Sequence, residues 1–138
     1  MPSPGVPPFN PLILEAERRG IPVVSETELA FRFLRVPVIA ITGTNGKTTV
    51  TALVGHILGK AGKRAFVGGN IGNPLAGYVG GPQDDDWAVL ELSSFQLQRI
   101  ETFRARVAVL LNRAPDHLDY HADYAEYCRA KERIFENQ

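Results

Sequence analysis

Residues 37–51 read Pro-Val-Ile-Ala-Ile-Thr-Gly-Thr-Asn-Gly-Lys-Thr-Thr-Val-Thr, and this stretch decides the fold. Residues 38–42 form a β-prone apolar run that stops at Gly43. From Lys47 onward the apolar residues follow the spacing of one helix face, which we expect to pack on a sheet. They are Val50, Leu53, Val54, Ile57, Leu58 and Ala61. The pattern predicts a strand, a glycine turn and a helix in direct succession.

The glycine turn is typical of a phosphate-binding loop. A helix that begins inside such a turn directs unpaired N–H groups and its positive dipole end into the turn, where a phosphate fits. Gly43 and Gly46 allow the close backbone approach that the cradle needs. We expect Lys47 to bridge the β- and γ-phosphates and the Thr48 hydroxyl to complete the shell of a Mg²⁺ ion. The stretch therefore predicts triphosphate binding.

The loop departs from the usual nucleotide-binding pattern, in which four residues separate two glycines. Five positions before Gly46 the chain has Ile41, and the first glycine is Gly43. An ordinary strand-to-helix turn is the alternative for so short a pattern. The apolar strand before the loop and the amphipathic helix after it are the context that the phosphate-binding motif requires.

Three further strands are predicted at 64–67, 87–92 and 106–112. Because helical segments separate them, the strands should pair in parallel through right-handed crossovers, which predicts a doubly wound, mostly parallel α/β sheet. The first eleven residues contain five prolines and are predicted to form a loop or linker. The other expected elements are helices at 12–19, 26–35 and 122–136, a short strand at 21–24, and helical turns at 75–79 and 94–100.

Polar residues follow the predicted strands at the sheet edge where α/β proteins bind ligands. Asn70 lies in a glycine-rich turn and has a side chain that both donates and accepts, although asparagine also suits a left-handed turn. Glu91, near the end of an apolar strand, is costly to bury unless it meets a cation. In a nucleotide site that cation is Mg²⁺, and a surface arginine is the alternative.

More candidates follow the third and fourth predicted strands. Ser93 and Ser94 come directly after the third, and helix capping is the simpler role for a serine there. Asp116 and His117 follow the fourth, and the His117 imidazole is able to bind a metal or orient a ligand. An Asp-His pair in a loop also forms an ordinary turn and cap, so both interpretations stay open.

Lys131 lies on the apolar face of the last predicted helix. The apolar residues of that face are Tyr124, Tyr127, Cys128, Ile134 and Phe135. An ammonium group on such a face extends to solvent, pairs with an acid, or loses its proton through a lowered pKa. A neutral buried amine is a nucleophile that adds carbon dioxide to give an anionic carbamate, which would suit a metal.

Composition limits the expected partners and location. The chain has 138 residues, enough for one core, with 15 basic and 15 acidic side chains and a formal net charge of zero. No basic field is present to hold nucleic acid or an anionic membrane, so we expect small-molecule partners. A single cysteine excludes an internal disulfide, and the sequence shows neither a leader nor a membrane-spanning apolar run. These features favour a cytoplasmic protein.

Five motifs, in order, resemble the central ATP-binding domain of the Mur ligases. They are residues 43–49 (Gly-Thr-Asn-Gly-Lys-Thr-Thr), 68–72 (Gly-Gly-Asn-Ile-Gly), 91–97 (Glu-Leu-Ser-Ser-Phe-Gln-Leu), 116–119 (Asp-His-Leu-Asp) and 130–131 (Ala-Lys). Residues 3–7 (Ser-Pro-Gly-Val-Pro) and 95–97 (Phe-Gln-Leu) are most similar to the family members that add D-glutamate. The resemblance covers almost the whole chain.

The resemblance implies an ATP-dependent, cytoplasmic step of peptidoglycan synthesis that joins D-glutamate to UDP-N-acetylmuramoyl-L-alanine through an acyl phosphate. The residues that it implies for ATP binding are Gly43, Thr44, Asn45, Gly46, Lys47, Thr48 and Thr49. Lys47 looks like the lysine that bridges the phosphates. Asn70 and Ser93 are similar to residues near the muramoyl substrate.

The resemblance also implies two Mg²⁺ ions. Thr48 and Glu91 resemble the ligands of the ion bound with ATP. His117 is similar to a ligand of the second ion, and Lys131 matches the lysine that becomes carbamylated and helps to hold it. Two metal ions together with Lys47 would neutralise charge on the moving phosphoryl group and on the carboxylate that receives it.

Mur ligases have three domains, and the resemblance implies only part of them here. Residues 1–36 are similar to the tail of the amino-terminal UDP-binding domain with its linker, and residues 37–138 to the first part of the central domain. We therefore expect a truncated chain with little or no ligase turnover alone, since proximity supplies much of a ligase's rate. The intact enzyme is expected to be a monomer, whereas the raw sheet edge of a partial domain invites self-association.

Three alternatives stay open. A related Mur ligase would add a different amino acid. A P-loop GTPase or kinase is disfavoured, because residues 112–116 (Asn-Arg-Ala-Pro-Asp) lack the Asn-Lys-x-Asp spacing associated with guanine recognition. A nucleotide-binding fragment without catalysis is the third.

Overall fold

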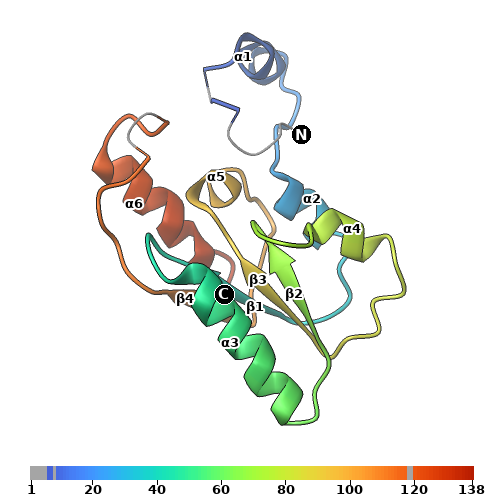
Figure 1. Cartoon of the computed structure of the whole chain (residues 1–138). Coiled ribbons are helices and arrows are strands. Elements are labelled where there is room, and N and C mark those ends of the chain that lie inside the picture. Colours follow the sequence, from blue (N-terminus) through green and yellow to red (C-terminus); the bar gives the residue numbers. More distant parts are fainter. Residues whose placement is uncertain (1–5, 8, 118–119) are drawn as a thin grey trace.

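A parallel sheet with helices on both faces forms the body of the molecule (Figure 1). The computed structural model describes residues 6–7, 9–117 and 120–138. Within these residues the strands are β1 (Val38–Thr42), β2 (Ala65–Gly69), β3 (Trp87–Glu91) and β4 (Val107–Leu110), in the spatial order β2-β3-β1-β4. Each neighbouring pair runs in parallel. The doubly wound, mostly parallel α/β fold expected from the sequence is confirmed.

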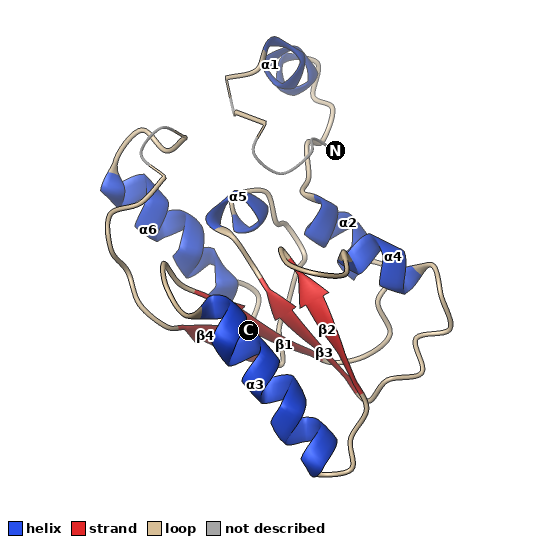
Figure 2. Ribbon diagram, viewed as in Figure 1, coloured by secondary structure: helices blue, strands red, loops and turns tan. Residues whose placement is uncertain are grey.

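The helices form a layer on each face of the sheet (Figure 2). On one face lies α3 (Lys47–Lys60). The opposite layer contains α2 (Glu26–Phe31), α4 (Leu75–Val79), α5 (Ser94–Leu97) and α6 (Tyr124–Glu132) with the 3₁₀ turn η1 (Arg133–Phe135). The first helix, α1 (Pro11–Arg18), lies away from the sheet (Figure 1). None of the helices formed by the described residues has the length and apolar character needed to cross a bilayer.

The main core lies between the sheet and the second helical layer. Val38 and Ala40 of β1 and Ala88 and Leu90 of β3 contribute to it, because alternate residues of a strand face the same side. The helices contribute Ala30, Leu75, Leu97 and Ile134, and the chain after α5 contributes Ile100, Phe103 and Ala105. This cluster fixes both the central strands and the segment that leads into β4.

A buried carboxylate, Glu28 of α2, joins this helix to the segment after α5. Its oxygens accept hydrogen bonds from the backbone N–H groups of Glu101 (2.9 Å), Thr102 (3.1 Å) and Phe103 (2.9 Å). The Thr102 hydroxyl donates at 2.7 Å and Arg32 Nε at 2.9 Å. Burial alone would raise the pKa of the Glu28 carboxyl, but these donors outweigh it and lower the pKa to about 2.

Several predicted elements have different bounds, such as the helical turn at 94–100, which ends at Leu97, and the predicted strand at 106–112, which is β4 (Val107–Leu110). Residues 21–24 form no strand, because the Ile21 N–H donates back to Ala16 O of α1. The predicted helix at 26–35 ends at Phe31, where the chain tightens into a 3₁₀-type turn with the Leu34 N–H donating to Phe31 O. The predicted helix at 122–136 is α6 followed by η1, and the Asp123 side chain caps its start.

The apolar stripe predicted for α3 is partly wrong. Leu53 and Ile57 are 52% and 56% exposed, whereas Thr51 is fully buried. The helix approaches the sheet through Gly55, where an added Cβ would lie 2.5 Å from Val67 Cγ2. The residues that allow this close packing are small or polar. A hydropathy pattern does not detect them, and it therefore identifies the wrong face of α3 as the buried one.

Candidate phosphate-binding and metal site

The candidate site lies at the carboxyl ends of β1, β3 and β4, on the loop between β1 and α3 (Figure 2). Because β1 is flanked by β3 and β4, its loop is placed between the last residues of both neighbours. Gly46 is the N-cap of α3, with φ of 83°, and no side chain caps the helix. The N–H groups at the start of α3 are therefore not engaged by a capping side chain, as a phosphate cradle requires.

The loop is held by its own Thr44 side chain and by side chains from α3 and α6. Thr44 Oγ1 lies 2.9 Å from the Tyr127 hydroxyl and accepts the Ala114 N–H at 3.0 Å. Lys47 Nζ donates to Thr44 O at 2.9 Å, so its amine lies over the loop. Gly43 has φ of 154°, and a Cβ there would lie 3.1 Å from Leu111 Cβ. The loop therefore needs glycine at this point.

Glu91, the last residue of β3, is buried beside the loop at 2% exposure. Thr48 Oγ1 donates to Glu91 Oε2 at 2.8 Å, and Asn70 Nδ2 lies 3.4 Å from Oε1. The Asn70 N–H also donates to the Glu91 backbone carbonyl at 2.8 Å. No Lys, Arg or His nitrogen among the described residues makes an ion pair with Glu91, so the surface-arginine alternative does not hold there.

The Thr48 hydroxyl and the Glu91 carboxylate fit a Mg²⁺ ion whose other ligands are water molecules and phosphate oxygens. Such an ion takes only one or two oxygen ligands from the protein, and a hydroxyl with a buried carboxylate supplies these. Within the described parts of the chain, no cluster of three or more His, Cys, Asp or Glu side chains has the geometry of a metal site. A cage made by protein alone is therefore not formed by these residues.

Lys131 of α6 is buried at 2% exposure, next to the start of the loop. Its Nζ donates to Gly43 O at 2.9 Å and lies 4.6 Å from the centre of the Tyr127 ring. Burial and the positive charge of Lys47 lower the pKa of the Lys131 amine to about 8, although Asp116 and Glu91 oppose this. The Lys131 side chain does not reach solvent and forms no ion pair with the described residues, and the pKa of its amine is lowered.

Replacing Lys131 with methionine should expose the cost of burying this amine. The folded pKa is about 8 against 10.5 for the free side chain, so between these values the unfolded chain binds more protons. The stability of the natural chain should therefore rise with pH across this window relative to Lys131→Met. Below pH 8 we expect the variant to be more stable by about 1–3 kcal/mol.

Urea unfolding of both chains between pH 7 and 10.5, in buffers free of carbon dioxide, measures this difference. A difference that does not change with pH, or a variant that is less stable at pH 7, contradicts the prediction.

His117 lies on an exposed turn with φ of 51°. Its ring is 4.9 Å from the Phe95 ring and 6.3 Å from the Tyr127 ring, and Nε2 lies 3.6 Å from Asp116 Oδ2. The turn is therefore on the same edge of the sheet as Lys131. The last two residues of the Asp-His-Leu-Asp motif, Leu118 and Asp119, lie outside the described residues.

Ser93 has the capping role that its position suggested. Its Oγ accepts the Gln96 N–H at 3.3 Å, and Gln96 Oε1 in turn accepts the Ser93 N–H at 3.0 Å. This reciprocal cap fixes the start of α5 directly after Glu91. Ser94, the neighbouring serine, lies 2.9 Å from Nε2 of the buried His121.

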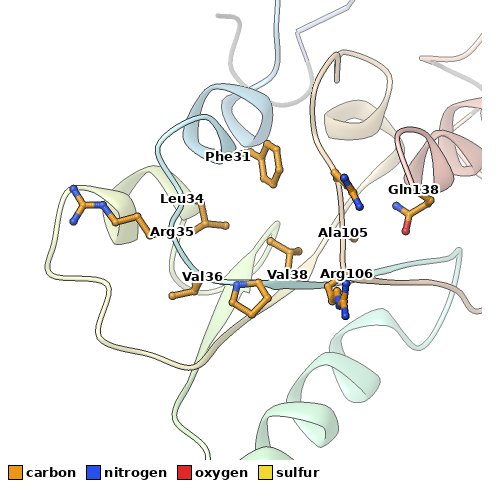
Figure 3. Close-up of a pocket in the computed structure, with 10 residues that line it drawn as sticks. Phe31, Leu34, Arg35, Val36, Val38, Ala105, Arg106 and Gln138 are labelled. Carbon is orange, nitrogen blue, oxygen red and sulfur yellow. The ribbon is translucent and has the colours of Figure 1, made fainter.

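A hollow lies at the end of the sheet opposite the candidate site, where β1 and β4 begin (Figure 3). It has a volume of about 570 Å³, and Phe31, Leu34 and Val38 contribute apolar side chains to it. Arg106 lies at its edge, whereas the Arg35 side chain extends away from the other labelled residues (Figure 3). None of the predicted site residues lines this hollow.

Residues 41–138 match the Mur ligase middle domain. The chain belongs to the Mur ligase family. The matched region includes the loop between β1 and α3, Glu91, His117 and Lys131, which are the candidate residues at the carboxyl edge of the sheet.

Curated Mur ligases resemble the chain along its whole length. It is 59% identical over 138 residues to the UDP-N-acetylmuramoylalanine–D-glutamate ligase of Syntrophus aciditrophicus, a match that covers 100% of this chain and 30% of that protein. The protein of the same name from Geobacter metallireducens is 57% identical over 136 residues, which are 99% of this chain and 30% of the relative. The chain therefore spans 30% of the length of these relatives.

Solved Mur ligase structures share the fold. MurF from Acinetobacter baumannii aligns with a TM-score of 0.57 and 26% identity, over 79% of this chain and 26% of that one. A UDP-N-acetylmuramoyl-L-alanyl-D-glutamate–2,6-diaminopimelate ligase aligns with a TM-score of 0.58 and 24% identity, over 86% and 26% of the two chains. At this identity the second likeness concerns the fold alone.

Sequence reasoning missed several residues of this site. Asn112 and Tyr127 both hold the loop between β1 and α3, and the His121 ring stacks with the Phe95 ring. The position of Asn112 at the end of the fourth strand was the one available signal. Tyr127 was recognised only as an apolar residue of its helix, because nothing in a pattern places its hydroxyl next to Thr44.

Proposed function

We propose that this chain is part of an ATP-dependent amide ligase of peptidoglycan precursor synthesis, which adds D-glutamate to UDP-N-acetylmuramoyl-L-alanine in the cytoplasm. The names of its curated relatives support this assignment. The observation that carries it is the position of Lys131, whose buried amine lies 2.9 Å from the first carbonyl of the phosphate loop. A nucleotide loop without catalysis would have no evident use for such an amine.

The residues of the site are assigned roles by their positions. Residues 43–49 would hold the phosphates of ATP, and Lys47 would neutralise the oxygens between the β- and γ-phosphates. Thr48 and Glu91 would hold the Mg²⁺ ion that arrives with ATP. Asn70, which contacts Glu91, and Ser93, which begins α5, would border the muramoyl substrate.

His117 and Lys131 would hold a second Mg²⁺ ion. For this role the neutral Lys131 amine adds to carbon dioxide, which forms an N–C bond and releases a proton to give a carbamate. The lowered pKa of Lys131 favours this step, since the neutral amine is the nucleophile. When bound, the two ions would offset negative charge on the reacting phosphoryl and carboxylate groups.

The proposed reaction has two steps. A carboxylate oxygen of UDP-N-acetylmuramoyl-L-alanine attacks the γ-phosphorus, the bond to the β-phosphate oxygen breaks, and ADP leaves. The D-glutamate amine then attacks the carbonyl carbon of the acyl phosphate, the C–O bond breaks, phosphate leaves, and the amine loses a proton. The site residues orient the phosphates and reduce charge repulsion in the first step.

In the intact protein, residues 1–36 would belong to the end of the UDP-binding domain and its linker, and residues 37–138 to the ATP-binding domain. We propose that the intact enzyme is a monomer. The 138-residue chain would self-associate, because β4 is an edge strand and its Val107 is exposed.

The 138-residue chain alone is expected to bind MgATP but to release little or no ADP in the presence of both substrates. Its relatives are more than three times as long, and their remaining segments would hold the other reactants close. Calorimetric titration with ATP and GTP, together with an ADP-release assay, tests this. Equal affinity for GTP would favour a GTPase, and ADP release that requires D-glutamate at a whole-enzyme rate would contradict the expected inactivity.

A chimera tests whether this chain supplies the ATP-binding part of such a ligase. This chain would replace the matching residues of the Syntrophus aciditrophicus relative, with that relative as the positive control. We expect ADP release that requires D-glutamate and is lost on Glu91→Gln. A folded chimera that never consumes ATP would favour a non-catalytic nucleotide-binding role.

A further inference from the structure

The side-chain amide of Asn112 holds the phosphate loop with both of its polar atoms. Asn112 follows β4, and its Oδ1 accepts the N–H of Thr44 at 3.1 Å and the N–H of Asn45 at 2.9 Å. Its Nδ2 donates to Asn45 O at 2.9 Å, and its backbone carbonyl accepts the Thr44 N–H at 3.2 Å. One side chain thus fixes two successive peptides of the loop.

This contact decides which loop amides are directed toward a ligand. The N–H groups of Thr44 and Asn45 point to Asn112, so they are not available to a phosphate in this arrangement. The amides that remain are those at the start of α3, after Gly46, where no side chain forms a cap. A phosphate at this position also gains from the helix dipole.

The backbone brings β4 close enough for this contact. Gly43 packs against Leu111, and the Leu111 N–H donates to Thr42 O at 2.9 Å, which continues the β1–β4 pairing beyond the strands. Asn112 is therefore the first residue after this pairing, opposite the turn of the loop. Asparagine suits the position because it presents an acceptor and a donor on one short side chain.

We propose that Asn112 is a positioning residue for phosphate binding, which acts through the loop and does not touch the nucleotide. It fixes the loop so that the N–H groups at the start of α3 are directed at the phosphate. The N–H groups of Thr44 and Asn45 are directed at Asn112 and away from the phosphate. The inference rests on the proposed nucleotide-binding function. It adds to that function a residue from the segment after β4, whereas the loop follows β1.

Amide hydrogen exchange of the 138-residue chain tests the contact without any nucleotide. In Asn112→Ala, the Asn45 amide should exchange at least tenfold faster than in the natural chain, because its acceptor is lost. The Thr44 amide keeps the Asn112 backbone carbonyl as an acceptor, so its exchange should change less. Asn112→Asp keeps the acceptor, so these two amides should stay protected.

Asn137→Ala is a matched control, since the Asn137 side chain also makes hydrogen bonds to the backbone but away from the loop. Its Nδ2 donates to Glu101 O at 3.0 Å and to Phe103 O at 3.1 Å. This variant should leave the exchange of the loop amides unchanged. Unchanged exchange of the Asn45 amide in Asn112→Ala would overturn the proposed contact.

Titration with MgADP tests the role in phosphate binding. We expect Asn112→Ala to bind MgADP about tenfold more weakly than the natural chain, and Asn137→Ala to bind it with unchanged affinity even where its thermal stability falls. Equal affinity in Asn112→Ala and the natural chain would overturn the positioning role alone. If the natural chain itself fails to bind MgADP, both this inference and the proposed function are contradicted.

Discussion

Replacing Glu28 with glutamine is expected to lower the free energy of unfolding at pH 7 by about 3 kcal/mol. The buried Glu28 carboxylate accepts hydrogen bonds from three consecutive N–H groups, from the Thr102 hydroxyl and from Arg32. A glutamine amide fills the same space but directs its NH₂ group at some of these hydrogen-bond donors, and those donors lose their acceptor. The variant mainly loses the hydrogen bonds that join α2 to the segment after α5.

The pH dependence gives the prediction a second readout. The folded pKa of Glu28 is about 2 and its ordinary value is 4.5, so the stabilisation is full above pH 4.5 and is lost as pH falls toward 2. Urea unfolding at several pH values should show the gap between the natural chain and Glu28→Gln narrowing below pH 4.5.

Glu15→Gln is the matched control, since Glu15 pairs with Arg18 and Arg19 on an exposed face of α1 and should matter little. If Glu28→Gln lowers the free energy of unfolding no more than Glu15→Gln does, the buried hydrogen bonds of Glu28 do not stabilise the fold as predicted.

Replacing Lys47 with alanine is expected to weaken MgATP binding by about 100-fold, the effect of losing charge-assisted hydrogen bonds to phosphate oxygens. In the structure the amine already lies over the loop, 2.9 Å from Thr44 O. Because that contact is only partly buried, water replaces it, and the stability of the folded chain should change little.

Lys60→Ala provides the comparison, because Lys60 lies on the same helix at its far end. Calorimetric titration of the natural chain and both variants, with thermal unfolding in parallel, separates binding from folding. Retention of most of the affinity by Lys47→Ala would remove the phosphate-binding role of this lysine.

Local pattern was sufficient for the strand, loop and first turn of helix between Val38 and Thr48. The local pattern also identified Glu91 and Lys131 as candidate site residues, because a charged residue within an apolar pattern is recognisable without knowledge of its neighbours in space. These residues share one edge for a topological reason, since parallel strands place all their carboxyl ends together.

The missed parts depend on contacts that a local pattern does not contain. Asn112 braces the loop only because β4 pairs with β1, which the order of strands along the chain does not reveal. The buried face of α3 was misjudged because Gly55 and Thr51, and not a row of large apolar residues, make its closest contacts with the sheet. The absent strand at 21–24 had β-prone residues but no neighbouring strand to pair with.

The strand order also bears on how the chain is made. During synthesis β1 leaves the ribosome first, yet Ile39 pairs with Val89 and with Val107, both far downstream. β3 emerges only after α3, β2 and α4, and β4 emerges later still, so β1 is an apolar strand without a partner until residues 87–91 have been made. Such late, long-range pairing slows folding and leaves the strand open to capture by a chaperone.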